Sequence, residues 1–189
     1  MKITPAQPSD LPKLLAFREE AAAWLRGLGS DQWSRPYPTD RLLATIEAGT
    51  VFMLRDHAVT AGTITLTPEA EDGLWTNGEL GEPSMFINKL TVARTHAGQD
   101  IGGRLLDWAG DRAHRAGAAW LRLDAWTTNR ELQRYYLRHG FQHVRTVTEG
   151  GAVNGGPRVS GWLAQRPAQS TPHGFTDETP APDSIPLAG

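Results

Sequence analysis

Apolar residues recur every three to four positions in two stretches near the start of the chain, residues 11–26 and the stretch between Thr39 and Gly49. This spacing places them along one face of a helix. A residue that commonly caps helices stands at the start of each stretch, and a glycine follows its end. We therefore predict two amphipathic helices, and similar patterns predict helices over residues 101–116 and 129–139.

Short apolar runs between turn-forming residues predict the strands. Two of these runs, residues 51–54 and 60–66, are separated by a short polar turn and form a predicted hairpin. The other predicted strands are residues 3–6, 85–92, 118–126, 141–148 and 158–165. Helices and strands that alternate in this way predict an α/β fold.

One junction between a strand and a helix, residues 87–109, carries the most distinctive pattern. The chain passes there from a strand through a glycine-bearing turn into a helix, with Gly98, Gly102 and Gly103 in or next to the turn. In such a turn the backbone N–H groups and the positive end of the helix dipole converge on one point. The sequence therefore predicts a phosphate-binding turn. It fits neither the dinucleotide-binding glycine pattern nor the Walker pattern.

Composition narrows the class of protein. The chain has 189 residues, which suits one compact domain, and a net charge of −2, which gives no support for nucleic-acid binding. It has no cysteine, and its histidines lack metal-ligand spacing, so we expect no metal site. A leader peptide and a membrane-spanning run are not recognisable, so we expect a cytoplasmic protein without membrane contact. The richness in alanine, arginine and glycine suggests a bacterial genome of high GC content.

The composition changes after Arg166. Residues 167–189 contain five prolines, no lysine or arginine, and few large apolar groups. Such a segment buries too little surface to offset the entropy lost on ordering it. We therefore predict a domain over residues 1–166 and a disordered tail over residues 167–189. If the tail is ordered, it must dock on the domain or on another chain.

The stretch 129–141 resembles the second signature of the GCN5-related N-acetyltransferases, the GNAT superfamily. That signature contains an asparagine, a small or apolar residue three positions on, a pair formed by an aromatic residue and a tyrosine, and a Gly-Phe dipeptide. The chain matches these positions with Asn129, Leu132, Tyr135-Tyr136 and Gly140-Phe141.

The first signature of that superfamily, Arg/Gln-x-x-Gly-x-Gly/Ala, is degraded here. In the preferred register Ala97, Asp100 and Gly102 take its three defined positions. In an alternative register Gln99, Gly102 and Arg104 take them. Because Asp100 replaces a glycine, its carboxylate either caps the helix or repels a bound phosphate. Arg104, one turn further on, is a candidate counter-charge.

The resemblance covers residues 3–165 and implies a single GNAT-like α/β domain. Its mixed, mostly antiparallel sheet is flanked by helices and splayed between the strands that end at Val92 and begin near Leu121. Acetyl-CoA is the implied acyl donor. The implied donor-binding residues are Leu90, Thr91 and Val92 along the pantetheine arm, Ala97, Gly98, Gln99, Asp100, Ile101, Gly102 and Gly103 around the pyrophosphate, and Asn129, Leu132 and Tyr136 beside the pantetheine. Tyr136 is also the implied general acid, which protonates the departing thiolate.

Acyl transfer to an amine needs a polarised carbonyl, a neutral amine and a stabilised thiolate. A phenol remains protonated at pH 7 and can stabilise the thiolate. Glu79, Glu82 and Asp124 are candidate bases for the amine, and none of them stands out. Simpler roles stay open, because Tyr136 also suits a core position and Asn129 also suits a helix cap.

Two loops admit two interpretations each. Trp33 and Tyr37, in the loop of residues 30–38, either line a pocket or cover an edge of the core. The acidic stretch 67–83 is either a solvated loop or a rim that attracts a cationic amine.

We therefore predict transfer of an acetyl group from acetyl-CoA to the primary amine of a small molecule, by direct attack without an acyl-enzyme. Two other classes stay open. Ala97 and Asp100 motivate a non-catalytic acyl-CoA-binding module. The tail motivates a protein that binds another small ligand and docks a partner through residues 167–189. A homodimer is compatible with the sequence but has no support in it.

Overall fold

In the computed structural model the described residues are 1–30, 32–33, 37–149 and 159–185. The strands are β1 (Lys2–Pro5), β2 (Val51–Asp56), β3 (Val59–Thr67), β4 (Ser84–Val92), β5 (Trp120–Trp126), β6 (Gln142–Thr146), β7 (Ser160–Pro167) and β8 (Thr176–Asp177). Within these ranges they form one mixed sheet in the order β6-β7-β5-β4-β3-β2-β1-β8. The pairs β1–β2, β2–β3, β5–β7 and β6–β7 are antiparallel, and β4–β5 and β1–β8 are parallel. The predicted α/β class with a mixed, mostly antiparallel sheet is confirmed.

The helices are α1 (Leu11–Gly27), α2 (Thr39–Glu47), α3 (Asn77–Leu80), α4 (Ile101–Arg115) and α5 (Arg130–Arg138), with short 3-10 helices η1 (Pro8–Asp10) and η2 (Arg94–His96). The predicted helices correspond to α1, α2, α4 and α5. Helix α3 lies inside the stretch 67–83, where no helix is predicted, because a single turn carries no apolar period. Thr76 and Glu79 form a reciprocal capping box that holds this turn.

The chain divides into two compact units. The first comprises residues 1–66, 89–105 and 174–180, and the second comprises residues 67–88, 106–173 and 181–189. In the first unit, α1 and α2 bury their apolar stripes against strand β2. Leu14, Leu42 and Ile46 of the helices pack with Val51 and Met53 of the strand.

Gly62 of β3 fixes how closely the first turn of α4 approaches the sheet. A Cβ atom at this position would lie 3.0 Å from the carbonyl oxygen of Thr91 and 3.2 Å from Cδ1 of Leu105. A larger residue would therefore push β3 away from β4 and from α4. Glycine at this position keeps the end of β4 and the start of α4 together, and these two segments flank the predicted phosphate-binding turn.

In the second unit, β5 lies between β4 and β7. Its side chains Leu121 and Leu123 are buried, and it pairs with β7 over its whole length. The parallel register with β4 covers only Ser84–Ile87 and Trp120–Leu123. Residues 88–92 of β4 and 124–126 of β5 lie beyond this parallel register.

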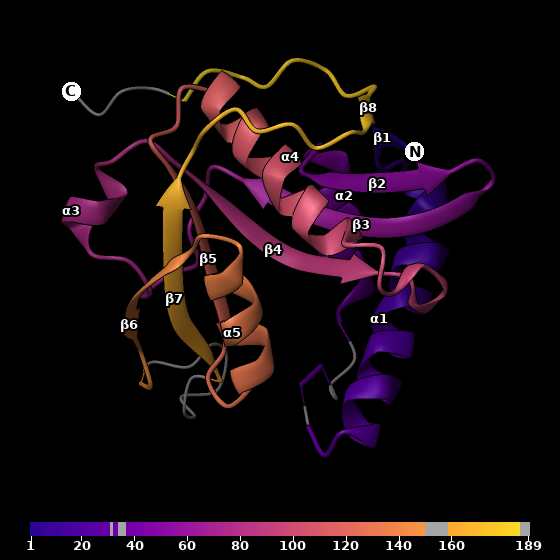
Figure 1. Ribbon diagram of the computed structural model, residues 1–189, viewed down its shortest axis with the longest axis horizontal. Coiled ribbons are helices and arrows are strands. Elements are labelled where there is room, and N and C mark those ends of the chain that lie inside the picture. The colour runs from indigo at the N-terminus through magenta and orange to yellow at the C-terminus, as the bar shows by residue number, and fades with distance from the viewer. Residues whose placement is uncertain (31, 34–36, 150–158, 186–189) are drawn as a thin grey trace. The chain divides into compact units, whose positions relative to one another are not determined.

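The segment after β7 differs from the predicted disorder. In the first unit it returns to the N-terminus, where β8 lies beside β1 (Figure 1). The amide of Thr176 donates to the carbonyl of Met1 at 3.1 Å, and the amide of Glu178 donates to that of Ile3 at 2.9 Å. Residues 174–180 thus belong to a compact unit, although the predicted domain ends at residue 166.

One aromatic side chain anchors this segment. Phe175 is buried, and the guanidinium of Arg104 lies 4.2 Å from its ring centroid. Nη2 of Arg104 also donates to the carbonyl oxygen of Gly174 at 3.0 Å. These contacts and the hydrogen bonds to β1 fasten a segment whose average composition favours disorder.

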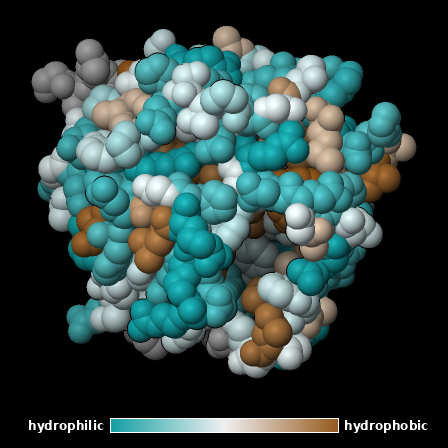
Figure 2. Space-filling model, viewed as in Figure 1, coloured by the Kyte–Doolittle hydropathy of each residue, from teal (hydrophilic) through white to brown (hydrophobic). Residues whose placement is uncertain are grey.

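The described surface, helices and acidic or histidine side chains are the places where membrane-spanning or metal-binding features, which the sequence does not predict, would lie. Figure 2 shows a face on which hydrophilic residues predominate. The large hydrophobic side chains exposed among the described residues come from separate elements, for example Trp24 of α1, Val59 of β3 and Leu137 of α5. None of the helices in the described ranges is long and apolar enough to cross a membrane. The same ranges contain no group of three or more acidic or histidine side chains placed to hold a metal ion.

Candidate active site

The C-terminal half of β4 carries the residues predicted to follow the pantetheine arm. The first four residues of the strand are buried and the last five are half-buried, among them Leu90, Thr91 and Val92. Lys89, directly before them, has a φ of 49°. This left-handed conformation is unfavourable for a lysine and interrupts the regular pleat of the strand. Such an interruption redirects side chains and is common beside functional sites.

The predicted phosphate-binding turn lies between η2 and α4. Residues 97–100 are exposed, and two of them have positive φ values, Gly98 at 81° and Asp100 at 51°. A Cβ atom at Gly98 would meet no other atom within 4 Å, so the space beside the turn is open. The amide of Arg104 donates to the carbonyl of Asp100 at 3.1 Å, which begins the helical hydrogen bonding of α4. An exposed turn at the N-terminus of a 15-residue helix suits a phosphate group.

Asp100 stands where the superfamily pattern has glycine, and its positive φ gives a physical reason for that preference. We expect Asp100→Gly and Asp100→Asn each to tighten acetyl-CoA binding about tenfold, because each removes a negative charge beside the phosphates. Only Asp100→Gly also removes the strain of a side chain at positive φ, so this variant should unfold at a higher temperature than Asp100→Asn. Calorimetric titration and thermal unfolding measure the two effects.

The matched control for this prediction is Asp40→Asn. Asp40 is exposed in the first turn of α2, so the substitution removes the same charge from another helix N-terminus of the same unit. Its acetyl-CoA affinity should equal that of the wild type. If all three variants bind acetyl-CoA equally well, the charge of Asp100 does not act on the phosphates.

Arg104 was a candidate counter-charge for Asp100. The structure shows its guanidinium against Gly174 and Phe175 of the C-terminal segment. A Cβ atom at Gly174 would lie 2.9 Å from Nη2 of Arg104, which shows how closely the two approach. Arg104 therefore links the first turn of α4 to the C-terminal segment.

Helix α5 begins at Arg130, one residue after its predicted start, and Asn129 stands directly before it. The Oδ1 atom of Asn129 accepts a hydrogen bond from the amide of Leu132 at 3.0 Å, so this residue is an N-cap. Buried Gln133 fastens the helix to the end of β5, because its Nε2 donates to the carbonyls of Trp126 and Thr127, each at 3.0 Å. These contacts set the start and the orientation of the helix that carries Tyr136.

Tyr136 is buried on the inner face of α5, with 8% of its surface exposed. Its ring makes edge-to-face contacts with Tyr135 and Phe141, at centroid distances of 5.9 and 5.7 Å. Burial raises the pKa of Tyr136, and the nearby Tyr135 and Asp124 raise it further. The phenol therefore keeps its proton at neutral pH and can act as a hydrogen-bond or proton donor. The ring contacts are also those of a core residue, so the structure suits both roles that the sequence leaves open for Tyr136.

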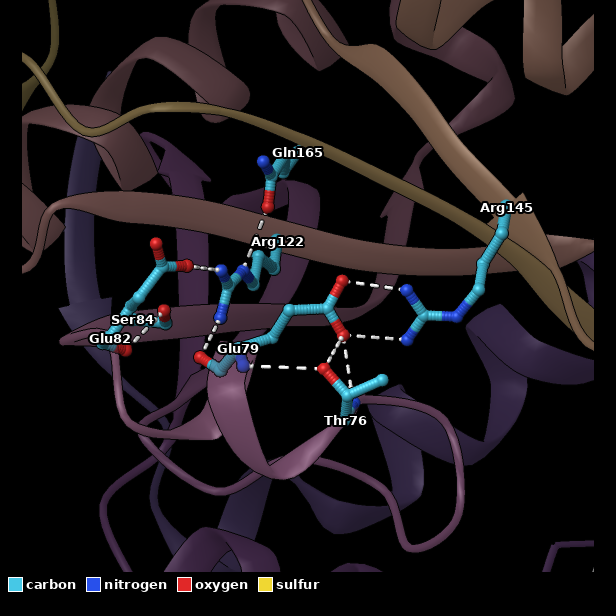
Figure 3. A network of polar contacts seen from close by, with 7 residues as sticks. All are labelled: Thr76, Glu79, Glu82, Ser84, Arg122, Arg145 and Gln165. Carbon is cyan, nitrogen blue, oxygen red and sulfur yellow. Dashed lines mark hydrogen bonds and ion pairs between the residues drawn. The ribbon is translucent and has the colours of Figure 1, made fainter.

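Two of the candidate bases belong to a polar network in the second unit (Figure 3). Both carboxylate oxygens of Glu79 accept hydrogen bonds of 2.6 Å from the guanidinium of Arg145. These bonds and those from Thr76 lower the pKa of Glu79 to about 2. Because the folded-state pKa is depressed from 4.5, the pair stabilises the fold fully above that pH and less as the pH falls towards 2. A carboxylate held in this way is a poor base near pH 7.

Glu82 pairs with Arg122, whose side chain has no exposed surface. Arg122 also donates to the carbonyl oxygen of Glu79 and to Oε1 of Gln165, and its guanidinium lies 4.8 Å from the ring centroid of Trp75. Figure 3 shows Arg122 between Glu82, Gln165 and the backbone of Glu79. The network therefore organises the end of the stretch 67–83 and pairs the carboxylates of Glu79 and Glu82 with arginines.

Asp124, the third candidate base, lies half-buried on β5 and accepts a hydrogen bond from the hydroxyl of Ser160. Its charge is one of the causes of the raised pKa of Tyr136, so the two groups interact electrostatically. This distinguishes Asp124 from Glu79 and Glu82, whose carboxylates are paired with arginines.

The aromatic residues of the loop after α1 line a pocket in the first unit. Trp33 and Tyr37 both contribute to it, and Tyr37 also packs against the core, so both interpretations of this loop hold. The pocket also contains Arg18 and Lys89, which the sequence analysis does not single out. Lys89 could be singled out from the sequence, because it is the only charged residue in the strand 84–92, whose other residues are apolar or uncharged.

Comparison with known proteins agrees with these features. A family model described as an acetyltransferase (GNAT) domain matches residues 47–143. The chain is 31% identical over 153 residues to the Uncharacterized N-acetyltransferase YesJ of Bacillus subtilis (strain 168), an alignment that covers 77% of this chain and 84% of that protein. It is 39% identical over 56 residues to the Aminoalkylphosphonate N-acetyltransferase of Salmonella typhimurium (strain LT2), which covers 30% of this chain and 36% of that protein.

Solved structures share the fold. An acetyltransferase of the GNAT family from Listeria monocytogenes superposes with a TM-score of 0.69 and 24% identity, over 87% of this chain and 93% of that chain. The putative acetyltransferase yncA from Salmonella typhimurium, solved with acetyl-CoA, superposes with a TM-score of 0.62 and 19% identity, over 91% of this chain and 96% of that chain.

Proposed function

Since the chain belongs to the GNAT family of acetyltransferases, we propose that it transfers the acetyl group of acetyl-CoA to the primary amine of a small molecule by direct attack. As a member of this family it is an acyl-CoA-dependent acyltransferase with acetyl-CoA as the donor. The proposal therefore concerns the acceptor and the residues that act.

The donor half of the proposed site lies in the first unit. The exposed turn before α4 is the observation that carries it, because its open backbone and the helix N-terminus suit a pyrophosphate. Its residues Ala97, Gly98, Gln99 and Asp100, with Ile101, Gly102 and Gly103 of α4, would hold the pyrophosphate. The half-buried end of β4, Leu90–Val92, would run along the pantetheine arm in the manner of an added strand.

The residue proposed to act in the acetyl transfer, Tyr136, lies on α5. When bound, acetyl-CoA supplies the acetyl thioester, and the acceptor nitrogen forms the new C–N bond as the C–S bond breaks. Tyr136 would donate its phenolic proton to the departing sulfur, and its raised pKa keeps that proton in place beforehand. Asn129 and Leu132 would border the pantetheine. The surplus proton of the acceptor nitrogen would leave to water, with Asp124 as the remaining carboxylate candidate.

A small amine is the favoured acceptor because of the acceptor for which one aligned relative is named. One of them is named for aminoalkylphosphonates, which are small aliphatic amines. The pocket lined by Trp33 and Tyr37 has a volume of about 40 Å³, which suits a small group.

Thermal unfolding with acetyl-CoA tests the donor half. Ligand at about 100 times its dissociation constant should stabilise the fold by about 2.7 kcal/mol, which raises the midpoint by roughly 5–10 °C for a chain of this size. Gln99→Glu adds one negative charge to the turn without changing side-chain size, so it should bind about tenfold more weakly and lose about half of this shift. Gln142→Glu makes the same change on exposed β6 and should behave as the wild type.

Release of free CoA thiol in the presence of a panel of small amines tests the acceptor. Acceleration by an amine supports the proposal. Acetyl-CoA binding without acceleration by any amine would overturn the small-molecule acceptor and favour the non-catalytic module. No thermal shift in the wild type would overturn the donor site itself.

A further inference from the structure

The pocket in the first unit combines cationic, hydroxyl-bearing and apolar side chains. Two cationic side chains line it, Arg18 from α1 and Lys89 from β4. Hydroxyl-bearing Thr63 and Thr65 of β3 and Thr91 of β4 form part of the wall. Apolar side chains from α1, α2 and β2 form the remainder. Among the described residues no carboxylate lines the pocket.

The aromatic rings of the pocket are already occupied by cations of the protein itself. The guanidinium of Arg18 lies 5.4 Å from the ring centroid of Trp33 and 5.1 Å from that of Tyr37. Nζ of Lys89 lies 4.6 Å from the same Tyr37 centroid. Exposed aromatic rings often receive the cation of a ligand, but two cations of the protein take that position here. A second ammonium group in this pocket would be repelled.

The surroundings of both cations favour an anion in the pocket. Burial lowers the pKa of Arg18, which reflects the water that this guanidinium has lost. Within the described ranges the one recorded contact of the Lys89 ammonium is with the Tyr37 ring. Its left-handed backbone is a strained arrangement, of a kind found where a strand presents a side chain to a site. Hydrogen bonds from cations to an anion are about twice as strong as neutral ones.

We propose that this pocket binds an anionic group of the acceptor, so that the acceptor is a small amine with a carboxylate or phosphonate-type group at its other end. This inference rests on the proposed function. Thr91 joins the two sites, because it lines the pocket and belongs to the strand end proposed to border the pantetheine arm. An acceptor anchored by its anion would extend its amine from the pocket.

A matched set of three amines tests the preference. Propylamine, 3-aminopropanoate and 2-aminoethylphosphonate share an aminoethyl unit and differ in the neutral, carboxylate or phosphonate group at the far end. We expect the wild type to use at least one of the anionic amines with a kcat/KM about tenfold or more above that of propylamine. Lys89→Met and Arg18→Gln should each reduce this ratio about tenfold. Arg26→Gln makes the same change as Arg18→Gln at an exposed position of α1 outside the pocket lining, and it should leave the ratio unaltered.

A second measurement needs no catalysis. Propanoate and ethylphosphonate carry the anion without an amine, and either should raise the unfolding temperature of the wild type relative to chloride at equal ionic strength. The rise should be absent in Lys89→Met. Comparison of the two anions, as of the two anionic amines, shows which anion the pocket prefers.

The outcomes separate the two proposals. Anion stabilisation that disappears in Lys89→Met, without turnover of any amine, would support the anion site and overturn the small-amine acceptor. Equal turnover of all three amines without anion stabilisation would overturn the anion site and leave the acetyltransferase proposal intact. A preference that survives in both Lys89→Met and Arg18→Gln would place the anion elsewhere and overturn this assignment.

Discussion

Tyr136→Phe should lower kcat for acetyl transfer by a factor of about 10²–10⁴, the range for loss of a positioned general acid. Phenylalanine keeps the ring that packs against Tyr135 and Phe141, so the fold and the acetyl-CoA affinity should remain. Steady-state kinetics with the best amine of the panel, together with acetyl-CoA titration, measures both quantities.

Tyr135→Phe is the matched control for this variant. It removes the same hydroxyl from the adjacent residue, which lies half-buried on the same helix, and it should change kcat less than threefold. Similar kcat values for the two variants would make Tyr136 a packing residue and end its assignment as the acid.

The pH profile of the wild type gives a further check on Tyr136. The acceptor must be neutral, so kcat/KM should rise with pH as the amine loses its proton. Because burial raises the pKa of Tyr136 above its usual value near 10, loss of the phenolic proton should not reduce the rate below that pH. A decline well below pH 10 would show that another acid donates the proton.

Arg122→Met should destabilise the second unit by about 1–3 kcal/mol, the usual cost of leaving buried hydrogen-bond acceptors without their donor. The side chain of Arg122 has no exposed surface and bonds to Glu82, Gln165 and the carbonyl of Glu79. Methionine fills much of the volume and leaves these acceptors unsatisfied. Urea unfolding followed by circular dichroism measures the change.

Arg134→Met is the control for the loss of the buried Arg122 side chain. Arg134 pairs with Glu131 three residues earlier on α5, but both side chains are largely exposed, at 61% and 78%. Its loss should cost less than about 1 kcal/mol. Equal destabilisation by the two variants would show that the network around Arg122 contributes no more than a surface pair.

Local patterns predicted much of the fold because they act through neighbouring residues. Asn129 illustrates this, since one residue type satisfies the family signature and caps α5 through its bond to the Leu132 amide. The same holds for the turn before α4, where Gly98 and Asp100 adopt the left-handed conformations that a glycine-rich pattern favours. In both cases the cause lies within a few residues of its effect.

The features that escaped prediction depend on contacts between residues distant in sequence. Phe175 orders the C-terminal segment through Arg104, which stands 71 positions earlier in the chain. Lys89 becomes part of a charged pocket because α1 brings Arg18 and the following loop brings Tyr37. Glu79 and Glu82 are suitable bases by residue type alone, and their arginine partners lie on β6 and β5. Composition and spacing do not encode such pairings.

Strand β8 has a consequence for how copies of this chain meet one another. The outer edge of a sheet offers a row of unpaired N–H and C=O groups on which another chain can add a strand. Here β8 covers that edge of β1 with only two residues, and Pro180 and Pro182 follow shortly after it. Proline has no N–H to donate, so the new edge is too short and too interrupted to template a further strand. The C-terminal segment therefore closes this side of the sheet against edge-to-edge aggregation.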